Sequence, residues 1–595
     1  MSEDAPEHRS PGAPSLSHPC RCGLMSELST PHSRRGLAWT GAALAFLALI
    51  ATCCHPAAQE TPAPPPPLPA TTDAHPSLPS SPTPPSPTAT PTPAIVPGGV
   101  VVQGGLEPVL HVDPQAHDLN PAERQVVDLL FESLLGVDPL DGRLQPALAE
   151  RWTFSPDGLV VTFWLREGIR WHDGTWLQEA DVVRTLEWAR DRSQGSPLWP
   201  RLRSVESIQA RGQGQVAVAF REPDCLAFWE LSQVKIVPQK WLEARASGAD
   251  EVPIGSGPFR WKAQEPDGRV VLESYRGYWG RAPYLDGWTY RPLSDLASLE
   301  RALAAGALDV FLWPEADPVP SWHPSTGYTL LPLPGDRYSL LIFNTRRPYL
   351  RRAGVRQALG SLLDRGALLR EVARAGMVVD APLPPQHWAL GNVATAPSPG
   401  DAATLLRALG LAGWLDNDGD GWLDYQGKPT TIAVETNQEN ALRIQTALRL
   451  AEQLRAAGLP AELRAAEWGV LLSDLERGDF DLAVIDLPLY LEPAGCSLWR
   501  GDTGTSGKRF NWAGVEDAGL LRALEEAVEV PGCDVAERAR LYRPVWDYLT
   551  QERPYLFLFV PARWLALDTA LKGLVASPFR PWYWNAADWH WAAGR

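Results

Sequence analysis

The chain has few methionines and cysteines, and it has no excess of positive charge. Among its 595 residues are three Met and seven Cys, and the net charge at pH 7 is −16. No basic stripe follows any segment, so a surface that tracks nucleic-acid phosphates is excluded. The cysteines are scattered and odd in number, and the sequence therefore predicts no disulfide framework.

The signatures of common catalytic sites are also missing. The chain contains neither the His-Glu-x-x-His pair of a zinc helix nor the Gly-x-Ser-x-Gly turn of a nucleophile elbow. Residues 504–508 imitate a phosphate-binding loop, but Asp502 and Arg509 replace the first glycine and the hydroxyl that such a loop needs. We therefore predict that the protein is not an enzyme.

Tryptophan is the residue in excess, with 26 Trp against 14 Phe. Aromatic side chains of this size serve either as walls of a ligand site or as core packing. For any single Trp, core packing is the simpler interpretation. The overall mix of 45% hydrophobic and 21% charged residues is that of an ordinary globular protein.

The N-terminal segment predicts export. Two arginines at 34–35 precede an apolar run over 36–52, which is typical of a secretory signal. The tetrapeptide 50–53 resembles a bacterial lipobox, whose cysteine, here Cys53, receives a lipid after cleavage. An uncleaved anchor helix and a twin-arginine signal are the alternatives, and each of them also exports the chain.

A proline-rich segment follows the signal. Between His55 and Pro97 the chain is almost entirely Pro, Thr, Ser and Ala, a composition that cannot bury enough apolar surface to fold. We predict that residues 1–53 are a leader and lipoprotein-type signal, with translation starting at Met25. Residues 54–99 are then a disordered, extended stalk between the membrane and the folded body.

Residues 146–190 predict a packed α+β unit. Two apolar segments flank the turn 155–158, where Pro presets one backbone angle and Gly accepts a positive φ. A second turn follows at 172–174. The hydrophobic period then becomes helical, with apolar residues on one face from Val182 to Ala189.

Several motifs in fixed order resemble one family. They are Pro-x-Leu-Ala-x-x-Trp at 146–152, Phe-x-Leu-Arg-x-Gly at 163–168, His-Asp-Gly at 172–174, Gly-Ser-Gly-Pro-Phe at 255–259 and Phe-Asn-Thr at 343–345. Together they resemble the extracytoplasmic solute-binding proteins of ABC importers, in the peptide/nickel-binding class known as family 5, which includes oligopeptide- and dipeptide-binding proteins.

Three smaller expectations concern these motifs. Gln178 stands where the family usually has Ser or Thr, so the helix after it lacks a hydroxyl N-cap, a loss of about 1 kcal/mol. The glycines of the 255–257 segment allow either a close backbone approach or a hinge. His172 is predicted to make a structural hydrogen bond, and a role as a ligand or base is the alternative.

The resemblance implies a fold and its boundaries. The fold would be α/β, a two-lobe periplasmic-binding-protein-like fold of class II with an extra subdomain, built of mixed sheets covered by helices. Lobe I would comprise 100–334 together with 517–595, including a subdomain at about 148–252. Lobe II would comprise 335–516.

The resemblance also implies a function. The protein would be a monomer anchored by lipid to the outer face of a bacterial cell membrane, outside the cytoplasm. It would capture a solute, an oligopeptide or dipeptide in the first instance, between its lobes and deliver it to a permease, with the ATPase on a separate chain. The alternatives are a ligand sensor, a receptor for a non-peptide solute such as an oligosaccharide, and an extracytoplasmic hydrolase.

Peptide-binding relatives often place an acid in a Trp-x-x-Asp-Tyr-x-x-Pro loop, where it pairs with the amino terminus of the peptide. The matching loop here is 485–493, in which Leu489 takes the place of the acid and the Trp is absent. Asp486 and Glu492 are the acids that could substitute. The predicted solute-binding residues are Trp388, Tyr490, Trp499, Asn511, Trp512, Asp118 and Asn120.

One acidic segment resembles a calcium loop. Asp416, Asp418, Asp420 and Asp424 occupy positions 1, 3, 5 and 9, but Gly427 occupies position 12, where a bidentate acid is required. A structural calcium ion and a metal-free Asp-Gly turn both fit this pattern. No other cofactor is predicted.

Overall fold

The computed structural model describes residues 95, 97–116, 118–196, 198–246, 252–314, 327–391, 402–495, 498–499 and 510–593. All of them lie in one compact unit, 89–595. The predicted signal with Cys53, nearly all of the predicted stalk and the segment 504–508 lie outside the described residues. None of the helices in the described part of the chain has the length and apolar character that a membrane span requires.

The first sheet has seven strands in the order β12-β21-β11-β1-β10-β9-β8. It is mixed, because β1 pairs in parallel with β10 and β11 while the other neighbours are antiparallel. Apolar side chains of α1 and of the strands form the core on one face, and α5 contributes to a second cluster. The bounds are β1 (Val100–Gly105), α1 (Pro121–Leu130), β8 (Phe259–Gln264), β9 (Val270–Ser274), β10 (Gly287–Pro292), α5 (Leu296–Ala304), β11 (Val310–Leu312), β12 (Tyr328–Leu333) and β21 (Arg563–Asp568).

A four-stranded antiparallel sheet, β4-β5-β7-β6, builds the subdomain of lobe I. The predicted hairpin is confirmed: β4 and β5 pair around a turn in which Gly158 has φ +73°. Alternate residues of β5, including Val161 and Phe163, are buried beneath the helices, as the period of two requires. The bounds are β4 (Ala149–Phe154), β5 (Val160–Leu165), α2 (Glu179–Arg190), β6 (Val205–Gly212), β7 (Gln215–Phe220), α3 (Cys225–Leu231) and α4 (Gln239–Ala246).

Helix α2 begins without a side-chain cap, as predicted. The side chain of Gln178 makes no capping hydrogen bond, although its backbone N–H donates to Asp181 Oδ2 at 2.9 Å. We expect Gln178→Ser to raise the free energy of unfolding by about 1 kcal/mol, because a hydroxyl satisfies an N–H of the first turn. Chemical denaturation measures the change, and an unchanged midpoint would contradict it.

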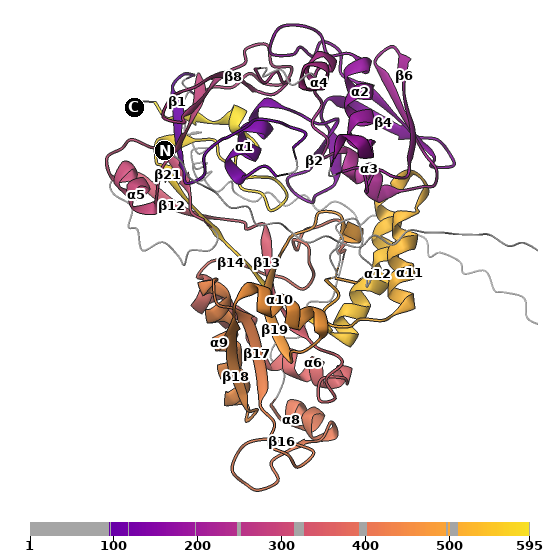
Figure 1. The fold of residues 1–595 in the computed structure, drawn as a ribbon, viewed down its shortest axis with the longest axis vertical. Coiled ribbons are helices and arrows are strands. Elements are labelled where there is room, and N and C mark those ends of the chain that lie inside the picture. Colours follow the sequence, from indigo (N-terminus) through magenta and orange to yellow (C-terminus); the bar gives the residue numbers. More distant parts are fainter. Residues whose placement is uncertain are drawn as a thin grey trace, which may run out of the picture. The chain divides into compact units, whose positions relative to one another are not determined.

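A third sheet of six strands, β14-β20-β13-β19-β17-β18, forms the core of lobe II. Strands β13 and β20 are buried over nearly their whole length, because clusters of buried side chains cover both faces of the sheet. In Figure 1, α9 runs beside β17 and β18, and α11 and α12 lie side by side. The bounds are β13 (Arg337–Phe343), α6 (Ala353–Leu362), α7 (Arg365–Leu368), β14 (Gly376–Val378), α8 (Ala402–Leu411), β17 (Ile432–Asn437), α9 (Ala441–Ala456), β18 (Ala461–Ala466), α10 (Trp468–Arg477), β19 (Leu482–Pro488), α11 (Ala518–Val528), α12 (Val535–Glu552) and β20 (Tyr555–Pro561).

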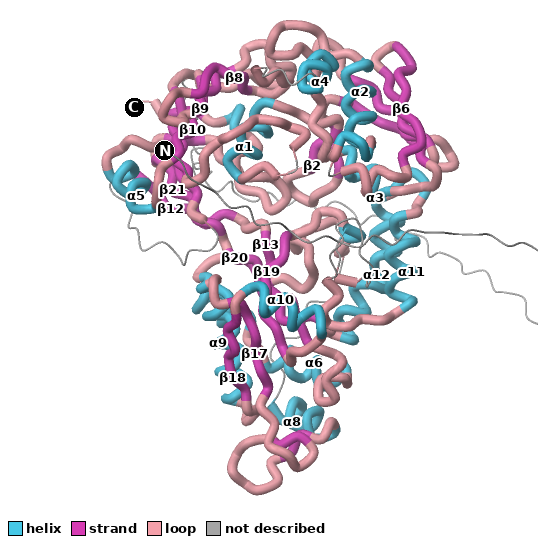
Figure 2. Tube along the Cα trace, in the orientation of Figure 1, coloured by secondary structure: helices cyan, strands magenta, loops and turns pink. Residues whose placement is uncertain are grey.

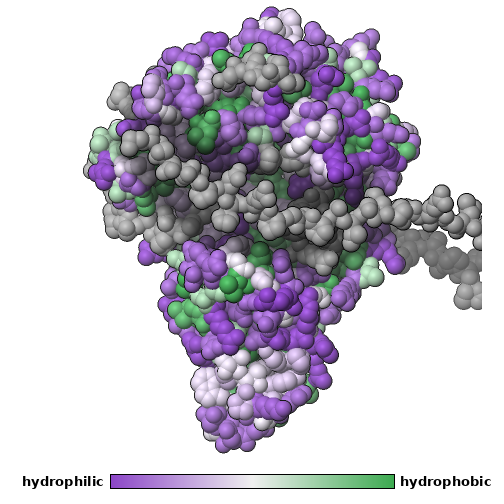
Figure 3. Space-filling view, viewed as in Figure 1, coloured by the Kyte–Doolittle hydropathy of each residue, from purple (hydrophilic) through white to green (hydrophobic). Residues whose placement is uncertain are grey.

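Three two-stranded sheets are also present in the described part of the chain, and Figure 2 shows the loops between the elements. They are β2 (Leu135–Val137) with β3 (Leu144–Pro146), β15 (Trp414–Leu415) with β16 (Asp424–Tyr425), and β22 (Leu571–Lys572) with β23 (His590–Trp591). In Figure 3 hydrophilic residues cover much of the visible surface, with smaller apolar patches between them.

The predicted return of the chain to lobe I at residue 517 is wrong. Helices α11 and α12 bury Leu524 and Trp546 in a core shared with β13 and β19, and β20 pairs with β13. The chain enters the seven-stranded sheet only at β21, immediately after Ala562. The earlier crossing lies between β12 and β13, at residues 334–336. Lobe II therefore extends through β20.

The sequence predicted no disulfide framework, and the structure corrects this prediction. Cys225 and Cys533 form a disulfide between α3 and a short turn, η4 (Pro531–Cys533), with 5.4 Å between their Cα atoms. The two cysteines are 308 positions apart, so no local spacing identified them as a pair.

Candidate solute-binding site

Five of the seven predicted binding residues come together in lobe II. Trp388, Trp499 and Trp512 belong to one buried cluster, Tyr490 packs against it, and Asn511 directly precedes Trp512. The indole rings of Trp499 and Trp512 are only 2% and 3% exposed. The five residues come from loops that follow β14 and β19 and that precede α11.

Two of these tryptophans have an unsatisfied donor. The Nε1–H groups of Trp499 and Trp512 are buried, and neither has a hydrogen-bond partner among the described residues. A buried N–H without a partner costs about 1–3 kcal/mol, and buried indoles usually avoid this cost.

Asn511 is occupied by its own loop. Its Nδ2 donates to the carbonyl of Val515 at 2.7 Å, and its Oδ1 accepts from the backbone N–H of Val515 at 2.8 Å. Tyr555 donates to the carbonyl of Leu498 at 2.9 Å, which attaches the neighbouring segment to β20. Asn511 thus shapes the loop that carries Trp512.

The remaining two predicted residues lie in lobe I, before α1. Asn120 is the N-cap of α1 and forms a capping box with Glu123, and its Nδ2 donates to the carbonyl of Pro108 at 2.8 Å. Asp118 is exposed. Between them, Leu119 lines a cavity of about 280 Å³ that α1 shares with residues 232–235. The structure does not bring these two residues into the aromatic cluster of lobe II.

The two acids near the altered peptide-recognition loop already have partners. Asp486 Oδ2 accepts from Arg443 Nε at 2.7 Å, and its Oδ1 accepts from Ser339 Oγ at 2.5 Å. Leu489, at the acid position of the family motif, packs against the aromatic cluster. Asp486 is thus already paired and Leu489 has no charge, so neither residue offers a free carboxylate to the amino terminus of a peptide.

Glu492 belongs to a buried charged network that the sequence did not reveal. Its Oε1 accepts from Arg538 Nη2 at 2.7 Å and from the Tyr542 hydroxyl at 2.8 Å. Arg538 also donates to the carbonyl of Ala527 and lies 5.1 Å from the ring centroid of Trp388. The nearby carboxylate raises the pKa of Arg538, although burial opposes this shift. The network connects α12 to Trp388.

His172 makes the structural hydrogen bonds predicted for it. The backbone N–H of Gly255 donates to its Nδ1 at 3.1 Å, so the proton resides on Nε2, which faces the carbonyl of Gly257 at 3.1 Å. His387 has the same arrangement, since its Nδ1 accepts from Ala389 and its Nε2 faces the carbonyl of Leu491 at 2.9 Å. Each imidazole is therefore held in a neutral form.

These two histidines predict a loss of stability in acid. Burial lowers the pKa of both His172 and His387 from 6.5 to about 4. Because the folded-state pKa is depressed, this contribution is complete above pH 6.5 and is lost as the pH falls toward 4, by about 3 kcal/mol for each histidine at the limit.

An NMR titration of labelled histidines, assigned with His172→Gln and His387→Gln, measures both values. We expect two imidazoles to remain neutral at pH 5 in the folded chain and to titrate near 6.5 in denaturant. Titration of the His172 and His387 imidazoles near 6.5 in the folded chain would contradict the prediction. Burial also raises the pKa of Glu435 to about 7. As the pH falls over this range, Glu435 therefore stabilises the folded chain and opposes the loss from the histidines. The titrations of the individual histidines are for this reason the decisive measurement.

The acidic loop brings three of its four aspartates together. Ligand oxygens of Asp416, Asp418 and Asp420 lie within 4.8 Å of one another, and all three side chains are exposed. Asp416 also accepts from the backbone N–H groups of Gly419 and Gly421, as in an Asx turn. Asp424 lies in β16, outside this group. Calcium binding therefore stays a prediction.

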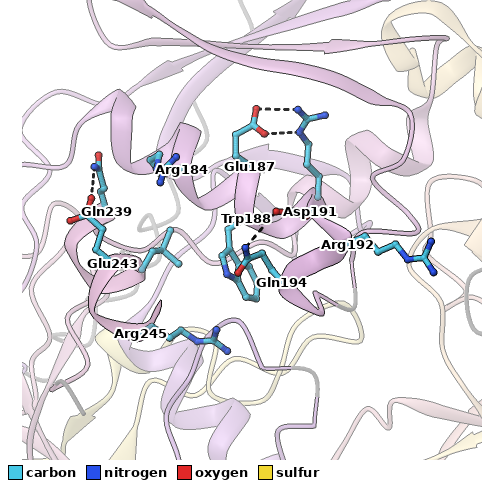
Figure 4. Close-up of a pocket in the computed structure, with 11 residues that line it drawn as sticks. Arg184, Glu187, Trp188, Asp191, Arg192, Gln194, Gln239, Glu243 and Arg245 are labelled. Carbon is cyan, nitrogen blue, oxygen red and sulfur yellow. Dashed lines mark hydrogen bonds and ion pairs between the residues drawn. The ribbon is translucent and has the colours of Figure 1, made fainter. Parts of the chain in front are cut away.

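A second cavity, of about 640 Å³, lies away from the predicted site, between α2 and α4 of the subdomain (Figure 4). Much of its charge is paired: Arg190 with Glu187, and Arg245 with Asp113 outside the cavity. Gln239 donates to Glu243 within the same cavity. None of the predicted solute-binding residues lines it.

Comparisons with known proteins place the chain in a family. The model of the bacterial extracellular solute-binding proteins, family 5, matches residues 143–495. The oligopeptide-binding protein AppA of Bacillus subtilis is 25% identical over 493 residues, which cover 80% of this chain and 89% of AppA. The chain belongs to family 5, the substrate-binding proteins of ABC importers.

Solved structures show the same two-lobe α/β fold. AppA in complex with a nonapeptide has a TM-score of 0.60 at 24% identity and covers 84% of this chain and 100% of its own. The murein tripeptide binding protein MppA, in an unliganded open form, has a TM-score of 0.69 at 19% identity and coverages of 84% and 99%. NikZ from Campylobacter jejuni, in complex with Ni(L-His), has a TM-score of 0.62 at 21% identity and coverages of 82% and 99%.

Proposed function

We propose that the protein is a lipid-anchored receptor outside the cytoplasm that captures a peptide between its lobes and presents it to an ABC permease. No bond of the solute is broken. The oligopeptide-binding protein AppA is similar to this chain over nearly the whole folded body, and this similarity supports a peptide as the solute. The Cys225–Cys533 disulfide supports an oxidising compartment outside the cytoplasm.

The observation that carries the proposal is the pair of unsatisfied indole donors inside the aromatic cluster. Trp499 and Trp512 would donate to peptide carbonyl groups, and the rings of Trp388 and Tyr490 would accept apolar side chains. Because Asp486 and Glu492 are already paired with arginines, binding would not require a free amino terminus.

Isothermal titration calorimetry with a pool of nonapeptides, each prepared with a free and an acetylated amino terminus, tests this proposal. We expect the two forms to bind with similar affinity. Trp499→Phe or Trp512→Phe should weaken binding by about fivefold, because each removes one donor of about 1 kcal/mol and keeps most of the ring. Trp414→Phe is the matched control, since Trp414 is buried in the separate core on the other face of the sheet.

Two results would overturn the proposal. If no nonapeptide binds while Ni(L-His) does, the solute is a metal complex and not a peptide. If acetylation abolishes binding, an acid must hold the amino terminus, and the paired states of Asp486 and Glu492 do not describe the liganded protein.

The lipid anchor has its own test. We expect Cys53→Ser to move the protein from the membrane fraction to the soluble fraction of its host, because a lipidated cysteine is the attachment that we predict. Immunoblots of both fractions provide the measurement. A variant that remains with the membranes would indicate an uncleaved anchor helix instead.

A further inference from the structure

The Cys225–Cys533 disulfide connects the two lobes. Cys225 begins α3 in the subdomain of lobe I, and Cys533 ends η4 between α11 and α12, which belong to lobe II. The described backbone passes between the two large sheets at 334–336 and at 562. The disulfide is therefore a third covalent connection within the described part of the folded body.

The surfaces around the disulfide fit closely. A Cβ added to Gly158, in the β4–β5 turn, would lie 2.6 Å from Pro531 Cα, so the turn rests against η4. On the other side, Gly532 approaches Phe154 of β4. Cys533 itself packs against the apolar cluster of the subdomain. The end of the α11–α12 hairpin is thus docked on the subdomain as well as tethered to it.

Buried ion pairs lie on both sides of this junction. Glu230 of α3 and Glu492 of lobe II are 4% and 3% exposed, and each has one carboxylate oxygen without a hydrogen-bond partner among the described residues. Arg201 pairs with Glu230, and Arg538 pairs with Glu492. Burial and the neighbouring Glu492 charge raise the pKa of Glu230.

We propose that Cys225–Cys533 is a strap that keeps the α11–α12 hairpin docked on the subdomain during solute exchange. With the strap closed, the end of the α11–α12 hairpin cannot leave the subdomain, so the lobes move only in ways that keep this contact. Reduction by a dithiol breaks the S–S bond, produces two protonated thiols and converts the dithiol to a disulfide. The subdomain then separates from lobe II, and a bound solute leaves faster. The solute part of this inference rests on the proposed peptide function.

The test compares the oxidised protein, the protein treated with dithiothreitol and the Cys225→Ser/Cys533→Ser variant. Peptide mapping without reduction first establishes the cross-link. Small-angle scattering of the solute-free forms then gives the radius of gyration, and stopped-flow tryptophan fluorescence gives the dissociation rate of a bound nonapeptide. Circular dichroism verifies that each form is folded, and dithiothreitol added to the double variant controls for the other cysteines.

We expect both strap-free forms to have a larger radius of gyration than the oxidised form and to release the nonapeptide several-fold faster. Equal radii and equal dissociation rates in all forms would overturn the strap, as would peptide mapping that finds no cross-link. If the radii differ while no nonapeptide binds to any form, the strap stands and the proposed peptide function fails.

Discussion

Replacing Arg538 by methionine is expected to lower the free energy of unfolding by about 3–5 kcal/mol. The side chains of Arg538 and Glu492 are 6% and 3% exposed, so removal of the cation leaves a carboxylate that water cannot solvate. Tyr542 would remain as the main donor to Glu492 Oε1. Denaturant titration with a fixed slope provides the measurement.

Two further variants separate this effect from a general weakness of α12. Arg540 lies on the same helix and pairs with Glu537, but both side chains are exposed. Arg540→Met should therefore cost less than about 1 kcal/mol. The double variant Arg538→Met/Glu492→Gln should recover part of the loss, because it removes the uncompensated charge. Equal losses for Arg538→Met and Arg540→Met would contradict the account.

Gly255→Ala is expected to destabilise lobe I by about 3 kcal/mol or to prevent it from folding. A Cβ at this position would lie 1.9 Å from the carbonyl oxygen of Leu130, a backbone atom that cannot rotate away. The same segment holds the imidazole of His172 through two hydrogen bonds and its backbone N–H through a third, and Gly257 donates to the carbonyl of Leu130 at 2.8 Å. Any shift of Gly255 would disturb all of these contacts.

Gly354→Ala is the matched control, since it makes the same chemical change. Gly354 lies in α6, and an added Cβ there would have no atom within 4 Å. We expect this variant to gain about 0.5–1 kcal/mol from helix propensity. Thermal and chemical unfolding compare the two. A Gly255→Ala protein as stable as the wild type would show that the segment yields like a hinge.

The sequence predicted the local structure of the subdomain well because each signal there is short in range. The turn chemistry of Pro156, Asp157 and Gly158 lies directly between the strands that it joins. The same is true of the missing cap at Gln178, which depends on one residue and its helix. For the 255–257 segment, the sequence left open a close approach or a hinge, and the carbonyl of Leu130 decides for close approach.

The boundary of lobe II could not be predicted in the same way. Helices α11 and α12 are amphipathic, and such a pattern shows which face is buried but does not identify the sheet that covers it. Leu524 and Trp546 belong to a core that includes β13, more than a hundred residues earlier in the chain. These contacts place the two helices in lobe II. The pairing of Cys225 with Cys533 is long in range for the same reason.

Solute binding by the predicted residues stays a prediction, although the structure shows where each of them lies. The predicted aromatic residues share one core, because the loops after β14 and β19 meet there. Asn511 and Asn120 are polar and lie in loops, which made them candidates, yet both satisfy backbone groups of their own segments. Arg538 was missed because its importance comes from burial, and an arginine in an amphipathic helix looks solvent-exposed in sequence.

Native mass spectrometry of the protein incubated with a nonapeptide pool tests the central claim most directly. The account predicts a complex of one protein and one peptide, from which the peptide is recovered after prolonged incubation with its mass unchanged. Recovery of cleaved fragments, in amounts that grow with time and protein concentration, would identify an enzyme. The absence of any complex across the pool would show that peptides are not the solute.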